Sequence, residues 1–421
     1  SLLEARVFLS KFFGVSLSKK NYIVVIGLRA EKTLTLEGKK AFEEAELLIG
    51  ARRMTEAVQK PGQAVLHEYR SEKIAEYIKA HPEYRTVAIA LSGDVGFYSG
   101  AKKLLDLLGE EVQVICGISS VVYFMAKIGL SWDDAKIVSA HGRDCNLVSL
   151  IRNNRKVFSI LGTEDGVAAL ASKLVDYNMG DVTLYVGENL SYDQEKIFHD
   201  KAENLTEYHG DALSVVTAYN ENARPLPAVH GIRDEEFQRG KAPMTKEEVR
   251  TVSLSKLHLS EDSICYDVGA GTGSVSVEMA LRAWNGKVYA IEKKEDALAL
   301  LKENKQKFAV DNLEIISGMA PEAMMELEVP THAFIGGSSG NMDAIIKLLL
   351  EKNPEVRIVI NCITLETVTE AMEAIRKFDL EDVDIVQLGV ARSKSVGRYH
   401  MMMGENPIYI ISCSGRGEEP K

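Results

Sequence analysis

Short runs of β-forming residues alternate with helix-length segments along this chain, and this alternation constrains the fold more than any other feature. A first series of such runs comprises residues 22–28, 86–93, 112–117, 136–142, 157–162, 182–187 and 213–219. A second series comprises residues 263–269, 287–292, 313–318, 333–337, 357–363, 383–390 and 407–413. Strands that alternate with helices predict an α/β architecture with largely parallel sheets.

Two series of strands predict two domains, which also suits a chain of 421 residues, because one hydrophobic core rarely serves so long a chain. Residues 221–245 contain three prolines and little periodicity. We therefore expect a first domain at 21–222, a linker at 223–243 and a second domain at 244–421. Residues 1–20 have a helical pattern, and we expect an extra helix or a poorly ordered segment there.

The end of the second series differs from the rest. Residues 391–406, between its last two predicted strands, have no helical period, so we expect an antiparallel hairpin at the end of an otherwise parallel sheet. This connection also contains Met401, Met402 and Met403, which we expect to pack in the core.

Composition limits the classes of partner. The net charge of −11 argues against a general nucleic-acid binder, although it leaves room for a local basic pocket that binds an acidic small molecule. The five cysteines form no CxxC pair, so we expect neither a metal site nor a disulfide framework, as suits the cytoplasm. No apolar run approaches the roughly 18 residues of a membrane helix, so we expect no membrane association.

A glycine-rich loop, DVGAGTG at residues 267–273, follows the first strand of the second series. Its glycines let the backbone turn sharply and approach a ligand, and the helix that follows directs free N–H groups toward that ligand. Glu292 ends the next strand, 19 residues beyond Gly273, where a carboxylate can accept hydrogen bonds from ribose hydroxyls. Ser274 breaks the dinucleotide pattern G-x-G-x-x-G, and the loop lacks the GK[ST] of a P-loop.

The glycine loop, the acidic residue and the antiparallel final strand together resemble the class I S-adenosylmethionine-dependent methyltransferases. This resemblance implies cofactor contacts by Asp267, Gly269, Ala270, Gly271, Thr272, Gly273, Glu292, Gly318 and Ala320. It also places Gly337, in the loop GGSSG, beside the methyl acceptor. That loop lacks the Asn/Asp-Pro-Pro-aromatic signature of base-amino methyltransferases, which favours a carbon acceptor. Dinucleotide binding and a purely structural turn are the alternatives.

Glycine and small hydroxyl residues also follow the strands of the first series. These phrases, at residues 91–100, 116–120, 139–143 and 187–197, resemble the tetrapyrrole methylases of the cobalamin pathway. The resemblance covers residues 21–220 and implies cofactor contacts by Gly93, Asp94, Ser119 and Ser120. The sequence departs from that family at Val95 and Cys116, where proline is usual, and at residues 27–30, which lack further glycines.

The second half carries further matching phrases, GIRDEEF at 231–237 and MTKEEVR at 244–250. Both halves therefore resemble fused methyltransferases of corrin-ring biosynthesis. The resemblance implies a tetrapyrrole-methylase fold followed by a Rossmann-like class I methyltransferase with a seven-stranded sheet, each with one S-adenosylmethionine. It implies methylation of carbons 5 and 15 of precorrin-6 or cobalt-precorrin-6, decarboxylation of the carbon 12 acetate, and self-association.

Such a substrate carries several carboxylates, so it needs local cations. Candidate substrate-binding residues are Lys246, Arg250, Gly337, Arg392, Arg398 and His400. For the charged side chains among them, a solvated surface is the alternative role. Thr245 matches a family position near the cofactor and is also a candidate helix cap.

No catalytic residue stands out, because methyl transfer from a sulfonium depends chiefly on alignment of the two reactants and needs no strong base. Two other functions stay open. A methyltransferase that acts on another acceptor, such as RNA, would need a basic face with stacking aromatic residues, and the net charge of −11 counts against it. A non-catalytic tetrapyrrole-binding protein is the second, supported by the altered loop at 27–30.

Overall fold

The structure, a computed structural model, describes residues 20–26, 34–92, 97, 101–109, 112–140, 146–225 and 231–417. The loop at 27–30, Gly93, Asp94 and most of the N-terminal segment 1–20, for which we made predictions, lie outside these residues. Contacts divide the chain into a first unit of residues 1–143, 156–172 and 181–219, and a second unit of residues 144–155, 173–180 and 220–421. Within the described ranges, every helix is too short or too polar to cross a lipid bilayer.

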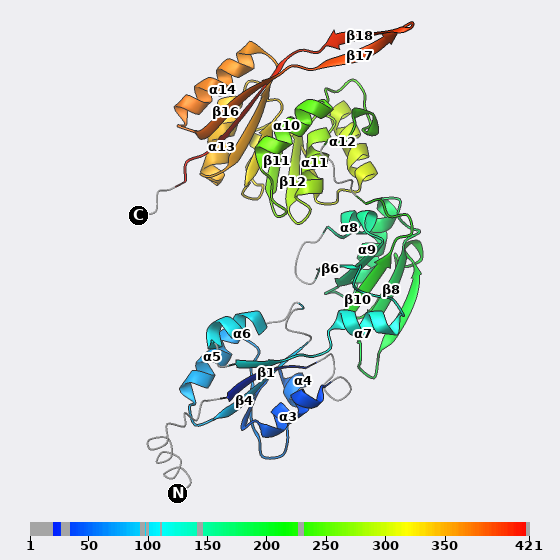
Figure 1. The fold of residues 1–421 in the computed structure, drawn as a ribbon, viewed down its shortest axis with the longest axis vertical. Coiled ribbons are helices and arrows are strands. Elements are labelled where there is room, and N and C mark those ends of the chain that lie inside the picture. Colours follow the sequence, from blue (N-terminus) through cyan, green and yellow to red (C-terminus); the bar gives the residue numbers. More distant parts are fainter. Residues whose placement is uncertain are drawn as a thin grey trace. The chain divides into compact units, whose positions relative to one another are not determined.

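The first sheet of the first unit is entirely parallel, as predicted (Figure 1). Its strand order is β3-β2-β4-β1-β5, from β1 (Lys20–Ile26), β2 (Leu47–Gly50), β3 (Ala64–His67), β4 (Thr86–Ser92) and β5 (Val112–Ile115). The accompanying helices are α3 (Leu36–Glu44), α4 (Arg52–Thr55), α5 (Ser71–Ala80) and α6 (Ala101–Leu108). Leu47 and Ile49 pack into one apolar cluster and Leu48 into another, so β2 is buried on both faces.

The second sheet is mostly antiparallel, and our prediction of a largely parallel sheet is wrong here. Its order is β6-β7-β10-β8-β9, from β6 (Lys136–Ser139), β7 (Lys156–Ile160), β8 (Thr183–Glu188), β9 (Lys196–Lys201) and β10 (Ser214–Tyr219). Only β6 and β7 pair in parallel among these described strands. The connection between β8 and β9 is too short for a crossover helix, so β9 returns antiparallel. Helix α7 (Ser120–Lys127) connects β5 of the first sheet with β6, and α9 (Gly166–Asp176) connects β7 with β8.

The second unit contains a seven-stranded sheet with the order β13-β12-β11-β14-β15-β19-β16. Its strands are β11 (Ile264–Val268), β12 (Lys287–Glu292), β13 (Leu313–Ser317), β14 (His332–Ile335), β15 (Arg357–Cys362), β16 (Glu381–Leu388) and β19 (Ile408–Ser414). The first five are parallel, and β19 pairs antiparallel with β15 and β16, which confirms the predicted antiparallel end. Five helices accompany this sheet in the described residues: α10 (Glu247–Leu257), α11 (Ser274–Arg282), α12 (Glu295–Phe308), α13 (Met342–Lys352) and α14 (Leu365–Lys377).

Both faces of the seven-stranded sheet are buried. Tyr266 and Val268 of β11 pack with α13 and α14 on one face, while Cys265 packs with α10, α11 and α12 on the other. Because successive side chains of a strand point to opposite faces, such a strand is apolar at most of its positions, with Asp267 as the exception in β11. This is why the five parallel strands are easily recognised in the sequence.

The connection between β16 and β19 forms a two-stranded sheet of its own, β17 (Ala391–Val396) with β18 (Tyr399–Gly404). This hairpin projects from the main sheet (Figure 1). Every residue of both strands is exposed, including Met401, Met402 and Met403. Our prediction that these methionines pack in the core is therefore wrong for this chain, because the hairpin extends beyond the sheet that would cover them.

Arg250 of α10 is fully buried, and its guanidinium is held on several sides. Its Nε donates to Glu278 of α11 at 2.5 Å, and its Nη1 donates to the Thr245 carbonyl at 2.6 Å and lies 3.3 Å from Asp234. Nη2 donates to the Ile232 carbonyl. Arg250 therefore fastens the segment before α10 to α11, inside the second unit.

We predict that Arg250→Met lowers the free energy of unfolding of the second unit by about 3–5 kcal/mol, because it leaves the Glu278 carboxylate buried without its cation. The chain has two tryptophans, so a Trp132→Phe background lets Trp284 fluorescence follow the second unit alone during urea unfolding. Arg376→Met, at an exposed position of α14, is the matched control. A loss for Arg250→Met no larger than that of the control would contradict the prediction.

Candidate cofactor and acceptor site

A cavity of about 650 Å³ lies at the carboxyl ends of the parallel strands of the second unit. Its walls include the loops that follow β11 (269–271), β12 (292–294), β13 (318–320) and β14 (336–339), together with residues 243–246 before α10. Open α/β sheets bind ligands at this end, where the loops converge. The predicted cofactor and acceptor loops therefore meet in one cavity.

The glycine loop approaches neighbouring backbone closely at two positions. Gly269 and Gly271 have φ angles of +76° and +56°, a region that disfavours side chains. A Cβ atom on Gly269 would lie 2.8 Å from the Gly337 carbonyl oxygen, and one on Gly271 would lie 2.7 Å from the Pro243 carbonyl oxygen. Glycine is thus required here by the protein's own backbone, which brings three walls of the cavity together.

Glu292 joins the glycine loop to the start of α12. Its Oε2 accepts the Gly271 N–H at 2.8 Å, and its Oε1 accepts the N–H groups of Lys293 and Lys294 at 2.8 and 2.9 Å. The side chain is buried and still lines the cavity. A carboxylate fixed in this way can also accept hydrogen bonds from ligand hydroxyls, since each oxygen has more than one acceptor site.

Asp267 is buried at 1% exposure just before the loop. Ser276 Oγ donates to its Oδ2, whereas Oδ1 has no partner among the described atoms. Burial is the main cause that raises the pKa of Asp267 to about 7; the Ser276 hydrogen bond opposes the rise and the nearby Glu292 carboxylate adds to it. Thr272 Oγ1 is also buried without a partner in the described structure. Neither Asp267 nor Thr272 lines the cavity, so both predicted cofactor residues lie behind the loop and not on its open side.

The other residues predicted to bind the cofactor lie as follows. Thr245, Ala270, Gly318 and Ala320 line the cavity, while Gly273 belongs to the loop without lining it. In the first unit, Ser119 Oγ accepts the Val122 N–H at 3.4 Å and so caps α7, and both Ser119 and Ser120 are buried. Gly93 and Asp94 lie outside the described residues.

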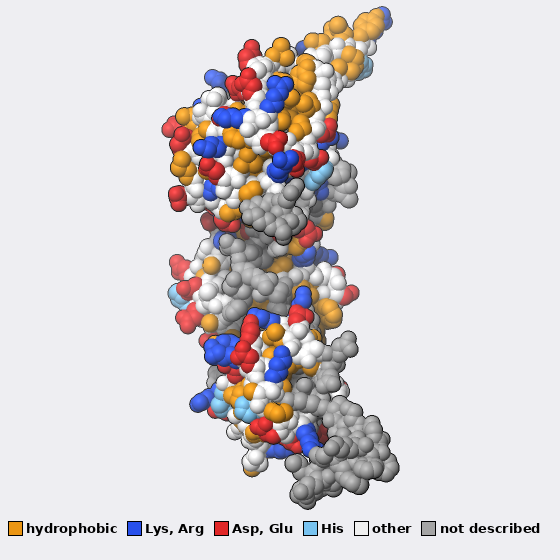
Figure 2. Space-filling model, turned by 90° about the vertical axis from the view of Figure 1, so that its left-hand side faces the viewer, with side chains coloured by type: hydrophobic (Ala, Val, Ile, Leu, Met, Phe, Trp, Pro, Cys, Tyr) orange, Lys and Arg blue, Asp and Glu red, His pale blue; other side chains and the backbone are white. Residues whose placement is uncertain are grey.

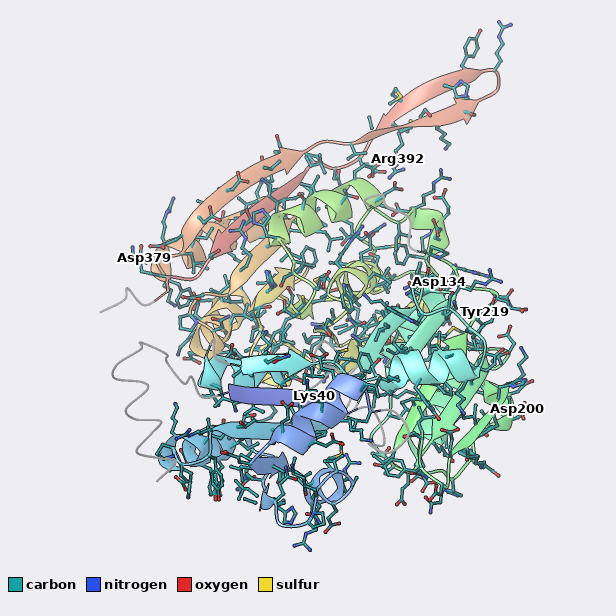
Figure 3. All side chains as sticks on the ribbon, turned by 60° about the horizontal axis from the view of Figure 1, so that its bottom comes forward. Lys40, Asp134, Asp200, Tyr219, Asp379 and Arg392 are labelled. Atoms are coloured by element: carbon teal, nitrogen blue, oxygen red, sulfur yellow. The ribbon has the colours of Figure 1, made fainter. Side chains whose placement is uncertain are left out.

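The candidate substrate residues separate into two groups. Lys246 and Gly337 line the cavity. Arg250, buried with Glu278 as described above, does not line it, and neither do Arg398 and His400, which are exposed on the hairpin. Arg392 lies at the base of the hairpin beside α10 (Figure 3) and pairs with Glu248 and, at 3.3 Å, with Glu405.

Two lysines of the cavity escaped the sequence analysis. Lys293 and Lys294 directly follow Glu292, and the Lys293 Nζ donates to Ser339 Oγ at 3.0 Å across the cavity wall. None of the ion pairs between described residues includes Lys246, Lys293 or Lys294. The signal that could have found them is the paired lysine directly after the predicted ribose carboxylate.

The strand order, the glycine loop and the acidic end of β12 define the second unit as a class I S-adenosylmethionine-dependent methyltransferase fold. Comparison with known families agrees: residues 235–414 match the precorrin methyltransferase domain, and residues 20–206 match the tetrapyrrole (corrin/porphyrin) methylases. The chain belongs to the precorrin methyltransferases, and its first half has a tetrapyrrole methylase domain.

Three similar proteins each cover less than half of this chain. A probable cobalt-precorrin-6B C(15)-methyltransferase (decarboxylating) of Pyrobaculum calidifontis is 45% identical over 189 residues, which span 44% of this chain and 96% of that protein. The cobalt-precorrin-6B C(15)-methyltransferase (decarboxylating) of Salmonella typhimurium is 40% identical over 43% of this chain and 95% of its own length. The crystal structure of precorrin-6y C5,15-methyltransferase from Geobacter metallireducens is 37% identical, with a TM-score of 0.42, over 44% of this chain and 97% of that chain.

We predict that Asp267 makes the stability of the second unit fall as pH rises. The folded-state pKa of about 7 exceeds the ordinary value of 3.8, so between these pH values the folded chain holds a proton that the unfolded chain has released. This contribution to stability is complete below about pH 4 and disappears by about pH 7, with a slope of up to about 1.4 kcal/mol per pH unit.

The measurement is the difference in unfolding free energy between the wild-type chain and Asp267→Asn, both in the Trp132→Phe background. The amide keeps an acceptor for Ser276 and does not titrate. Subtraction removes the contributions of carboxylates common to both proteins. A difference that is flat between pH 4 and pH 7 would show that Asp267 is ionised throughout this range.

Proposed function

We propose that this chain is a bifunctional methyltransferase of corrin-ring biosynthesis. It methylates carbons 5 and 15 of precorrin-6 or cobalt-precorrin-6 and removes the carboxyl group of the carbon 12 acetate, with S-adenosylmethionine as methyl donor. The observation that carries the proposal is the cavity of the second unit, where the glycine loop, Glu292 and three lysines meet. The names of similar proteins, decarboxylating C(15)-methyltransferases, support it.

The two reactions are assigned to separate units. The precorrin methyltransferase domain lies in the second unit, and the relatives are named for carbon 15 and for decarboxylation, so we assign both steps to this unit. The first domain matches the tetrapyrrole methylases, so we assign carbon 5 to it, with an S-adenosylmethionine of its own.

The four free cysteines among the described residues suit a reducing cytoplasm, which is the proposed location.

In the second unit, the chain's residues fix the position of the cofactor. When bound, S-adenosylmethionine supplies an activated methyl group. Glu292 accepts hydrogen bonds from the ribose, and the backbone of the glycine loop allows close approach. Asp267 does not line the cavity; it accepts a hydrogen bond from Ser276 and so supports the loop from behind. Thr245, Gly318 and Ala320 complete the walls. Alignment of the methyl group with a ring carbon is then the main contribution to rate.

The acceptor is oriented by charge. Lys246, Lys293 and Lys294 present ammonium groups at the cavity, and we propose that they bind the carboxylates of the ring. Gly337 offers open space, because a Cβ there would meet no atom within 4 Å, so the ring can approach its backbone. No described residue is assigned to decarboxylation, for which the conjugated ring provides the electron sink.

We also propose that the chain self-associates through the β17–β18 hairpin. Val396, Tyr399, Met401 and Met403 lie on one face of this hairpin, which they share with Lys394 opposite Met401 and Arg392 opposite Met403. Tyr399 is 62% exposed and Met401 53% exposed. Figure 2 shows the hairpin's apolar side chains at the upper end of the view. An exposed apolar patch of this kind marks an interaction surface.

The assembly can be tested by double substitution of this face. We predict that Met401→Glu with Met403→Glu lowers the molecular mass measured by light scattering to that of a single chain, because charges replace the apolar contact surface. Met325→Glu, at a methionine with 55% exposure outside the hairpin, is the control and keeps the wild-type mass. A wild-type chain that is already monomeric would refute the proposal.

The proposal that each unit has its own methyl-transfer site predicts a specific product for Gly271→Ala. The added Cβ clashes with Pro243 and deforms the cavity of the second unit, so S-adenosylmethionine no longer binds there. Mass spectrometry of the product should show two added methyl groups and one lost carboxyl group with the wild-type chain. With Gly271→Ala it should show one methyl group and an intact carboxyl group.

The matched control is Gly62→Ala, at a glycine of the first unit with a similar φ of +80° but open space around its Cβ. It carries the backbone strain without the clash, so its product should match that of the wild-type chain. Two methyl groups in the Gly271→Ala product would refute the assignment of the second site.

A further inference from the structure

A second cavity, of about 340 Å³, lies in the second unit and is lined by four arginines. Arg152 belongs to α8 (Leu147–Asn153) and Arg282 ends α11, while Arg233 precedes a short 3₁₀ helix (Asp234–Glu236) and Arg224 follows β10. This cavity shares no lining residue with the cofactor cavity. Four arginines and two glutamates line it, so its lining carries more cations than anions.

Backbone contacts hold two of the arginines together. The Arg224 N–H donates to the Arg152 carbonyl at 2.8 Å, and Asn220 Nδ2 donates to the Ile151 carbonyl at 2.9 Å. The chain after β10 is thereby fastened to the end of α8. Burial lowers the pKa of Arg152, the charge of Arg224 lowers it further, and the Glu236 carboxylate opposes this only in part.

Acidic residues of the cavity only partly balance this charge. Glu278 lines it, but its Oε1 already accepts from Arg250 Nε at 2.5 Å and from the Ile232 N–H at 3.0 Å. Glu236 is the other glutamate of the lining. Among the ion pairs of the described residues, none includes Arg152, Arg224 or Arg233. The cavity therefore carries excess positive charge in a chain whose net charge is −11.

The remaining lining is apolar. Ile232, Leu281 and Phe308 contribute side chains beside the arginines. Apolar surface next to guanidinium groups suits a carboxylate on a short aliphatic arm, since the arm buries apolar area while the carboxylate accepts paired N–H bonds. Inorganic phosphate offers only the charge. The volume suits one or two such arms and is at the small end for a whole ligand site.

We propose that this arginine-lined cavity binds the carboxylate arms of an organic oligocarboxylate. Two sources share this chemistry: the peripheral acetate and propionate arms of a tetrapyrrole, and a free aliphatic polycarboxylic acid. The proposal that the ligand is a tetrapyrrole rests on the proposed function. The proposal that the cavity binds carboxylate arms does not. Bound there by its edge, a tetrapyrrole would be held by the second unit at a place other than the methyl-transfer cavity.

The test uses the full-length chain and calorimetric titration with two probes, uroporphyrin and propane-1,2,3-tricarboxylate. Arg152→Gln with Arg233→Gln should weaken binding of the responsible probe about tenfold, as expected for partly exposed charge-assisted hydrogen bonds. Arg376→Gln, at an exposed arginine outside both cavities, is the matched control. If the double variant does not fold, the single substitution Arg233→Gln, at an exposed position, tests the cavity in its place.

Loss of uroporphyrin affinity alone identifies the tetrapyrrole as the source, and loss of tricarboxylate affinity identifies a free acid. Unchanged affinity for both probes in the double variant would overturn the proposal. Binding of S-adenosylmethionine should be the same in all variants, because the two cavities share no residue. Failure of the proposed function would look different: the wild-type chain would transfer no methyl group to a precorrin, whatever the outcome of these titrations.

Discussion

A single buried cation organises the second unit. Arg250 connects Glu278 of α11 with the carbonyl groups of Ile232 and Thr245, and so fixes the course of the chain before α10. That segment includes Pro243, whose carbonyl lies against Gly271 of the cofactor loop. The cavity wall therefore depends on an ion pair that no ligand needs to touch. Because a buried charge is costly without its partners, this arrangement tolerates little change.

The parts of the fold that could be predicted are the buried strands, because burial requires apolar residues that are visible in the sequence. Most residues of the five parallel strands of the second unit are apolar because the sheet is covered on both faces, although the edge strand β13 exposes Glu314 and Ser317. Glycine is needed in the loop after β11 because neighbouring backbone lies close to it. The β17–β18 hairpin could not be recognised, because its strands face solvent and carry no burial pattern. The antiparallel second sheet was missed because strand direction depends on connections, not on composition.

The sequence predicted which strand ends form the site, but not the direction of the side chains there. Spacing placed Gly269, Glu292 and Gly337 in loops that do converge on one cavity. Spacing could not tell which way a charged side chain points, so Arg250 was indistinguishable from a surface cation although it is 0% exposed. Lys293 was overlooked for the opposite reason: a lysine beside an acidic residue resembles an ordinary surface pair, yet here it lines the cavity.

The net charge of −11 and an anionic substrate are compatible because charge acts locally. At physiological ionic strength the screening length is about 8 Å, so exposed acidic residues on distant surfaces contribute little inside a cavity. The lysines line the cofactor cavity and the arginines line the smaller cavity, so a ligand bound in either would have cations as its direct neighbours. Concave walls also exclude water and strengthen the attraction. The distribution of cations, not their total number, therefore decides what this chain can bind.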